Sequence, residues 1–285
     1  MKAAIVPYKG NKLAIEYACR IIERLREFGC TFAMQSVLKP YISSEYAEFY
    51  KTQFEAIQNA DLAISIGGDG TIIHTAKDAA ILGKPVLGVN CGRVGFVADL
   101  EPSELDLLPE LIKGNYTVDE RMMLEITVSR DGEKNKAYAL NDVTITHGGV
   151  SRMIDLDVEL NGEFINEYRA DGIIIATPTG STAYSLSAGG PVIEPHMKCI
   201  LLTPICPHSL FSRSVLFSDD SEVTVFRGRD SRENPYVTVD GRRSEAIGEN
   251  DSITVRKADI SASFIKLNNK NFYRILSEKL SERMG

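Results

Sequence analysis

The chain is poor in the residues that hold metals and form disulfides, with five cysteines and four histidines among 285 residues. No cysteines stand in a Cys-x-x-Cys pair and no histidines have His-x-x-x-His spacing, which argues against a metal site held by the protein. The cysteines are scattered and odd in number, so we expect reduced thiols in a cytoplasmic protein.

Long apolar runs and a surplus of positive charge are also missing. No stretch approaches the roughly 18 apolar residues of a membrane helix, and the apolar start of the chain is too short for a signal-peptide core. We therefore expect no membrane partner. The 39 acidic and 32 basic residues give a net charge of −7, which disfavours a nucleic-acid partner. A small anionic substrate stays compatible, because a local site can be positive on an acidic protein.

The first hundred residues predict alternating strands and helices. Apolar stretches at residues 3–7, 62–66 and 85–89 are typical of buried strands. Between the first two, apolar residues from Ala14 to Phe28 recur at helical spacing and stop at Gly29. Strand–helix–strand alternation favours a parallel sheet with helices on its faces.

Beyond about residue 120 the pattern becomes that of short strands. Asp131-Gly132 and Asn161-Gly162 are hairpin-turn signals, and strand-like runs occur at residues 124–128, 137–146, 156–160, 172–176, 222–226, 236–239 and 252–255. A last apolar helical stripe runs from Phe272 to Leu280, and we expect it to pack on the N-terminal α/β layer.

These patterns predict two domains. Residues 1–119 with 269–285 form a Rossmann-like α/β domain with a parallel sheet, to which the C-terminal helix returns. Residues 120–268 form an all-β, sandwich-like domain.

One glycine-rich turn, Gly67-Gly68-Asp69-Gly70-Thr71, stands directly between a buried-type strand and a helix. Glycines let backbone N–H groups approach a ligand closely, and the helix N-terminus favours anions. A carboxylate is a poor neighbour for a phosphate, so Asp69 indicates another duty: accepting a proton from a hydroxyl, or holding a magnesium ion that travels with a nucleotide. The structural alternative is that Asp69 or Thr71 caps the helix.

A longer motif covers residues 171–191, where an apolar strand leads into a hydroxyl-rich turn and a short helix that stops at Gly189-Gly190-Pro191. Ser181 or Thr182 can cap that helix and leave N–H groups for an anion, and Tyr184 can stack on a ligand. A capped surface helix explains the same residues equally well.

Two further segments carry candidate residues with structural alternatives. Asn141-Asp142 can read the hydroxyl and amino groups of a nucleoside, although an Asx turn also explains the pair. Phe96, in the segment 88–97, can pack on a ligand or belong to the core.

Together these segments resemble the NAD kinase family. The turn at Asp69 is also similar to that of diacylglycerol kinases, sphingosine kinases and 6-phosphofructokinases, whereas residues 171–191 resemble NAD kinases alone. The resemblance runs in order from Asp61 to Gly241. Here Asp142 stands where the family has Glu, Val94 and Val97 stand where it has Leu, and the turn at Asp240 has no assigned role.

The resemblance implies transfer of the terminal phosphoryl of ATP, as its Mg²⁺ complex, to the adenosine 2′-hydroxyl of NAD. It implies that Asp69 is the catalytic base. It also implies a ligand pocket lined by Gly70, Ile73, Phe96, Asn141, Asp142, Arg169, Asp171, Thr182, Ala183, Tyr184, Ser187 and Cys206.

The family is oligomeric, so a homodimer or homotetramer is expected. Two alternatives stay open: a lipid kinase of the diacylglycerol kinase type, and a non-catalytic NAD-binding regulator. The sequence decides neither between ATP and polyphosphate as donor nor between NAD and NADH as acceptor.

Overall fold

The structure is a computed structural model that describes residues 1–42, 45–92, 95–148, 153–209, 212–229, 231, 234–268 and 270–282. The chain divides into two compact units. The first comprises Met1–Glu120 and Ala262–Gly285, and the second comprises Arg121–Ser261. The long strands β6 (Thr117–Arg130) and β17 (Ser252–Lys266) each run from one unit into the other.

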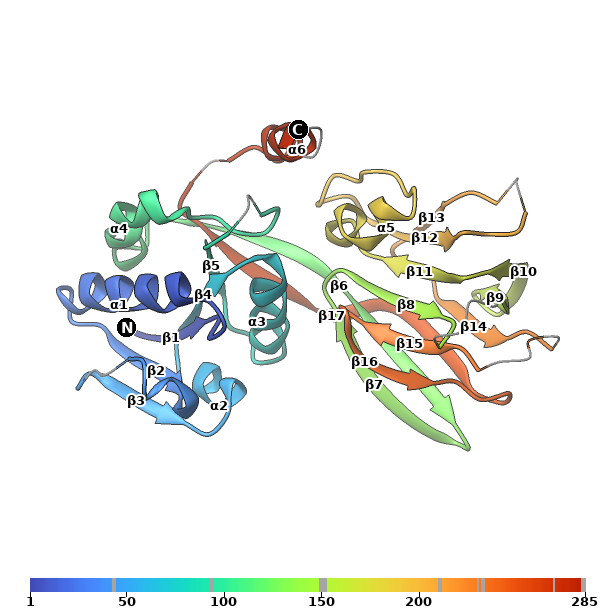
Figure 1. Cartoon of the computed structure of the whole chain (residues 1–285), viewed down its shortest axis with the longest axis horizontal. Coiled ribbons are helices and arrows are strands. Elements are labelled where there is room, and N and C mark those ends of the chain that lie inside the picture. The colour runs from blue at the N-terminus through green and yellow to red at the C-terminus, as the bar shows by residue number, and fades with distance from the viewer. Residues whose placement is uncertain are drawn as a thin grey trace. The chain divides into compact units, whose positions relative to one another are not determined.

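The first unit is built on a parallel sheet in which the strand order is β5-β4-β1-β2-β3 (Figure 1). The C-terminal part of β17 pairs in parallel with β5, through Phe264 opposite Val86. The strands are β1 (Lys2–Pro7), β2 (Thr31–Gln35), β3 (Ala47–Tyr50), β4 (Leu62–Gly67) and β5 (Val86–Asn90). The helices are α1 (Lys12–Arg26), α2 (Gln53–Gln58), α3 (Asp69–Ile81), α4 (Leu108–Lys113) and α6 (Phe272–Glu282), with the 3₁₀ turns η1 (Ser36–Leu38) and η2 (Pro102–Leu107).

Helices cover both faces of this sheet because its strands alternate between two apolar faces. Ile64 and Ile66 of β4 join the cluster that buries the inner face of α1. Ser65, between them, points to the opposite face, where its Oγ lies 2.9 Å from Oγ1 of Thr75 on α3. A fully buried aromatic such as Phe32 contributes about 1.5–3 kcal/mol to this core.

The second unit contains a six-stranded antiparallel sheet with the order β13-β12-β11-β8-β15-β16. Its strands are β8 (Asp142–Thr146), β11 (Gly172–Ala176), β12 (Cys199–Ile205), β13 (Val215–Ser218), β15 (Tyr236–Val239) and β16 (Arg242–Ala246). Opposite this sheet run β6, β7 (Glu133–Ala139), β9 (Ile154–Leu160), β10 (Glu163–Ala170), β14 (Val223–Arg227) and β17. The short turns η3 (Thr179–Thr182) and α5 (Tyr184–Ser187) follow β11.

One apolar cluster joins the inner faces of these two sets of strands, which makes the unit a sandwich. The buried side chains of Ile173 and Ile175 on β11 belong to the same cluster as those of Val223 and Val225 on β14. Turns with two left-handed residues close the hairpins, as at Asn161 (φ 52°) and Gly162 (φ 82°). Such pairs match the right-handed twist of the strands that they join.

The predicted fold class is confirmed: a parallel α/β unit, a β-sandwich and a C-terminal helix that belongs to the first unit. The strand-like run at residues 137–146 forms two strands, because β7 ends at Ala139 and β8 begins at Asp142. The backbone N–H groups of the residues between these strands donate to the carboxylate of another turn, as described below. Within the described residues, no helix is both long and apolar enough to cross a membrane.

Candidate functional site

The glycine turn that follows β4 places Asp69 at the first position of α3. Gly68 is the N-cap of this helix and makes no side-chain cap bond, so neither Asp69 nor Thr71 occupies the capping position. Instead, the Asp69 carboxylate accepts hydrogen bonds from the backbone of a separate segment. The N–H of Phe96 donates to Oδ2 at 3.0 Å and the N–H of Val97 donates to Oδ1 at 3.4 Å. These donors orient the carboxylate.

Two glycines make room for this arrangement. A Cβ on Gly95 would lie 2.2 Å from Oδ1 of Asp69, and a Cβ on Gly67 would lie 2.9 Å from Cβ of Thr71. Both separations are too short for any other residue without a shift. The glycines are therefore required at this site by close approach.

Three predicted ligand residues accompany Asp69 in the first unit. Gly70 is exposed, whereas the Ile73 side chain is 6% exposed and belongs to the buried side of α3. Phe96 is half-buried, and its ring centroid lies 6.3 Å from that of Phe272. Val94, predicted as an apolar replacement in the same segment, lies outside the described residues.

In the second unit, a network of backbone bonds holds Asn141. The carboxylate of Asp240 accepts the N–H groups of Leu140 at 3.0 Å, Asn141 at 2.9 Å and Asp142 at 3.2 Å. Asp240 has a left-handed φ of 47°, a conformation that Asp and Asn tolerate better than most residues. This gives the turn at Asp240 a role that its sequence did not reveal.

The motif after β11 fixes the same loop from another side. Thr177 Oγ1 donates to the carbonyl of Leu140 at 2.6 Å, and the N–H of Thr177 donates to the carbonyl of Asn141 at 2.8 Å. A Cβ on Gly180 would lie 2.0 Å from the Asn141 carbonyl oxygen. The structure thus brings Asn141 and Asp142 together with the turn at residues 177–182, as neighbours within one unit.

The predicted cap of the short helix in this motif is wrong. Helix α5 has Ala183 at its N-cap, with no side-chain cap bond. Ser181 instead donates to the Pro178 carbonyl and accepts the N–H of Ile193, and Thr182 donates to the Thr179 carbonyl. These hydroxyls are satisfied inside η3 and its surroundings because the chain there forms a 3₁₀ turn before α5 begins.

The predicted ligand residues of this motif differ in exposure. Thr182 is 9% exposed and Ala183 is half-buried, whereas Tyr184 is 46% exposed and Ser187 is exposed. Side chains that face solvent can touch a ligand directly. Of the four, Tyr184 and Ser187 meet this condition best.

Asp142 is a buried acid, 5% exposed. Burial, followed by the negative charge of Asp240, raises the pKa of the Asp142 carboxyl from 3.8 to about 7. A carboxyl with such a pKa is partly protonated at neutral pH. It can therefore donate a hydrogen bond as well as accept one.

Arg169, Asp171 and Cys206 lie together where β11 and β12 pair. The N–H of Asp171 donates to the Ile205 carbonyl at 3.0 Å, and the Arg169 carbonyl accepts the N–H of His208 at 2.8 Å. Cys206 is exposed and has a φ of 44°. The Arg169 side chain, 68% exposed, is 3.9 Å from Asp155 and borders a pocket of about 470 Å³.

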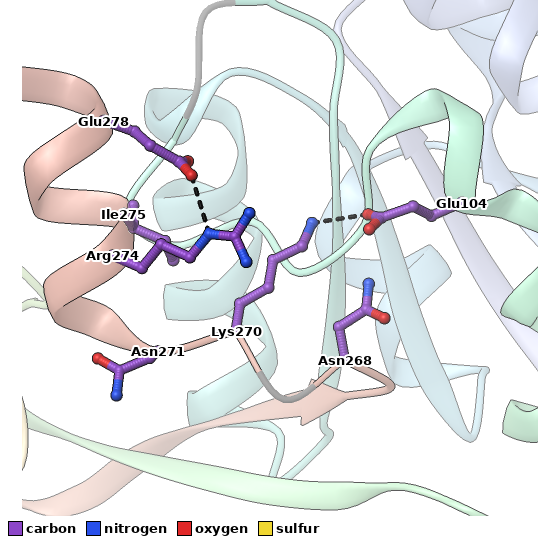
Figure 2. Close-up of a pocket in the computed structure, with 7 residues that line it drawn as sticks. All are labelled: Glu104, Asn268, Lys270, Asn271, Arg274, Ile275 and Glu278. Carbon is purple, nitrogen blue, oxygen red and sulfur yellow. Dashed lines mark hydrogen bonds and ion pairs between the residues drawn. The ribbon is translucent and has the colours of Figure 1, made fainter. Parts of the chain in front are cut away.

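A second pocket, of about 410 Å³, lies at the C-terminal segment of the first unit (Figure 2). It contains none of the predicted ligand residues and is lined by Glu104, Asn268, Lys270, Asn271, Arg274, Ile275 and Glu278. Among the described residues, no group of three or more His, Cys, Asp or Glu side chains could hold a metal ion.

Sequence reasoning missed the residues that support the candidates. Gly95, Gly180 and Asp240 act through contacts with residues far along the chain, so no local pattern marks them. Their residue types and their place in the segments that resemble the NAD kinase family were the available signals, and neither revealed these contacts.

Family models match most of the chain. The model of the ATP-NAD kinase N-terminal domain matches residues 4–116, and that of the ATP-NAD kinase C-terminal domain matches residues 140–267. The NAD kinase of Acetivibrio thermocellus is 35% identical over 285 residues, covering 99% of this chain and 98% of the relative. That of Heliobacterium modesticaldum is 44% identical over 232 residues, covering 80% and 81% respectively.

Two solved structures share the fold. Yeast NADH kinase complexed with NADH gives a TM-score of 0.89 at 25% identity, over 99% of this chain and 87% of the other. The NAD kinase of Archaeoglobus fulgidus in complex with ATP gives a TM-score of 0.76 at 27% identity, over 99% of both chains.

Proposed function

We propose that this chain, which belongs to the NAD kinase family, transfers the terminal phosphoryl group of ATP to the 2′-hydroxyl of the adenosine ribose of NAD and so makes NADP. The prediction of a phosphotransferase is confirmed by its relatives, which are NAD kinases. None of the relatives reported above supports the diacylglycerol kinase alternative.

The observation that carries the proposal is the orientation of the Asp69 carboxylate by backbone hydrogen bonds. Phosphoryl transfer needs positioning and electrostatic stabilisation more than covalent chemistry from the protein. The carboxylate stands in a glycine turn at the start of a helix, with backbone N–H groups of Phe96 and Val97 fixing its orientation. A carboxylate oriented in this way can take the ribose proton as the hydroxyl attacks.

The remaining site residues fall into direct contacts and supports. We assign direct ligand contact to exposed or half-buried groups: Gly70, Phe96, Asn141, Arg169, Asp171, Ala183, Tyr184, Ser187 and Cys206. The buried side chains of Ile73 in the first unit, and of Asp142 and Thr182 in the second, would support the ligand-contacting residues of their own unit. In this proposal the first unit carries the nucleotide-binding role and the second unit carries the NAD-binding loops.

ATP would act as its Mg²⁺ complex. When bound, the magnesium ion would neutralise the negative charge that develops on the donor phosphates. Asp69 is the one acid of the glycine turn, and its carboxylate already accepts two N–H groups. We therefore assign proton acceptance to Asp69, with the ion arriving on the donor.

A homodimer or homotetramer is part of the proposal. Strand β10 is the last strand of its sheet, and it exposes the apolar side chains of Phe164 (63%) and Ile165 (40%). An unpaired edge with apolar side chains favours pairing with another chain. Light scattering on the wild-type protein and on Phe164→Glu measures this, since the substitution should lower the mass of the assembly.

The test of the activity is direct. Purified protein with ATP, Mg²⁺ and NAD should form NADP, read with an NADP-specific dehydrogenase. Parallel reactions replace NAD with NADH, ATP with polyphosphate, and NAD with diacylglycerol. An absence of NADP together with labelling of the lipid would overturn the proposal.

A further inference from the structure

Residues 95–99 are held from two directions within the first unit. On one side they hold the candidate base, through the N–H groups of Phe96 and Val97 on the Asp69 carboxylate. Gly95 fits tightly against the same carboxylate, because any Cβ there would lie 2.2 Å from Oδ1. Small movements of this segment must therefore move Asp69.

On the other side, the segment is tied to the residues that follow β17. The Asp99 carboxylate, 1% exposed, accepts the N–H groups of Leu267 at 2.8 Å and Asn268 at 3.2 Å. Lys270 Nζ donates to the Asp99 carbonyl at 3.0 Å. It also donates to Glu104 at 2.6 Å, the contact that Figure 2 shows. These bonds fix the point at which the chain turns into α6.

The segment between β17 and α6 also positions the aromatic ring of Phe272. Asn271 accepts the N–H of Tyr273 at 2.8 Å, which caps the start of α6. Phe272, the first residue of the helix, brings its ring centroid to 6.3 Å from that of Phe96, with an angle of 40° between the planes. This distance is within the range of aromatic pairs that attract beyond simple burial.

We propose that Phe272 is a positioning residue for Asp69, acting through Phe96. The Phe272 ring packs against that of Phe96, whose backbone N–H is attached to the same Cα. Removing the Phe272 ring takes this packing away, which should loosen the Phe96 N–H bond to Oδ2 and weaken the orientation of the carboxylate that accepts the proton. The inference rests on the proposed function, in which Asp69 is the base.

The three variants for the test differ in one property each. Phe272→Ala removes the ring, and Phe272→Tyr keeps it. Arg274→Ala, on the same helix, removes a side chain that is 81% exposed and pairs with Glu278 four residues along (Figure 2). A melting temperature for each variant shows that it is folded.

The first readout is amide hydrogen exchange at Phe96 and Val97, which needs no substrate. In Phe272→Ala the Phe96 amide hydrogen should exchange about 10-fold faster than in the wild type. In Phe272→Tyr and Arg274→Ala its exchange rate should match that of the wild type. Unchanged exchange in Phe272→Ala overturns the inference, even if NADP formation succeeds. Because this readout is independent of activity, it decides the inference even when the wild type makes no NADP.

The second readout is turnover at saturating NAD and ATP. Phe272→Ala should lower kcat roughly 10-fold, less than the about 100-fold that a 1 Å misplacement can cost, with Phe272→Tyr within about 2-fold of the wild type. In an Asp69→Asn background the same substitution should have no further effect, because the group that it positions is gone. An equal loss in both backgrounds means that Phe272 acts elsewhere and contradicts the inference.

Discussion

In the first unit the Asp69 carboxylate, at a glycine turn, accepts the backbone N–H groups of Phe96 and Val97. In the second unit the Asp240 carboxylate, at a hairpin turn, accepts those of Leu140, Asn141 and Asp142. The bonds are alike, but the two acids have different roles. Asp69 is itself the candidate base, and its donors fix it. Asp240 is no ligand candidate, and it fixes the loop that carries Asn141.

This difference separates two ways in which an acid serves a site. Where the backbone orients the carboxylate, damage to the arrangement should appear in turnover. Where the carboxylate orients the backbone, damage should appear in NAD affinity and in stability. The following predictions break or sharpen that separation, beginning with the largest expected effect.

Asp69→Asn should lower turnover by about 10²–10⁴-fold, because a carboxamide cannot take the ribose proton. NAD affinity should change little. The measurement is kcat together with calorimetric NAD affinity and the melting temperature of the same preparation. A folded, NAD-binding variant that works near the wild-type rate would falsify the catalytic role.

Gly95→Ala should lower turnover by roughly 10- to 100-fold, since its Cβ would lie 2.2 Å from Asp69 Oδ1 and push the carboxylate aside. Gly92→Ala is the matched control, because a Cβ at Gly92 meets none of the described residues within 4 Å. NAD affinity should be similar in both variants. Equal kcat values for the two would show that the orientation of Asp69 does not matter.

Tyr184→Ala tests whether damage to the second unit lowers NAD affinity rather than turnover. The side chain is 46% exposed, so it is available to stack on a ligand or to hydrogen-bond with it. We expect NAD binding to weaken by about 1–3 kcal/mol while kcat at saturating NAD stays nearly unchanged. Calorimetry measures the affinity. A loss confined to kcat would contradict the separation between the two units.

Asp240→Asn should destabilise the second unit by about 1–3 kcal/mol, because the amide group faces backbone donors that the carboxylate accepted. Asn tolerates the left-handed φ of 47°, so the change isolates the carboxylate. The KM for NAD should rise, with kcat less affected. Asp131→Asn is the control, since Asp131 is exposed and has a similar φ of 50°.

Periodic patterns predicted the elements that bury one regular face. The strand before Asp69, the helix after it and the turn at Asn161-Gly162 all follow local rules and are confirmed. Strand β12 was not predicted as a strand, because Pro204 lies within it and proline lacks an N–H for the ladder. Strand β10 is mostly exposed and so has no burial alternation to read.

The candidate site was predictable as a set of motifs, but its supports were not. The bond between Asp69 and Phe96 joins residues 27 positions apart, and that between Asp240 and Leu140 joins residues 100 apart. Local spacing contains no information on such contacts, because they depend on how strands are ordered in the sheets. The role of Asp240 therefore needed the structure.

The smallest expected effect concerns Asp142, whose pKa is raised from 3.8 to about 7 by burial and by the charge of Asp240. The folded state binds this proton more tightly than the unfolded state, so its stabilising contribution is complete below about pH 4 and is lost as pH rises through about 7. Asp142→Asn replaces the carboxyl with a neutral group of similar shape. The melting temperature of Asp142→Asn, measured relative to that of the wild type, should therefore rise by roughly 2–5 °C from pH 5 to pH 8. Asp131→Asn, at an exposed turn, should show no such gain. A difference between wild type and Asp142→Asn that is the same at both pH values would show that Asp142 is ionised throughout, and Asp240 would then hold a loop that already carries a full negative charge.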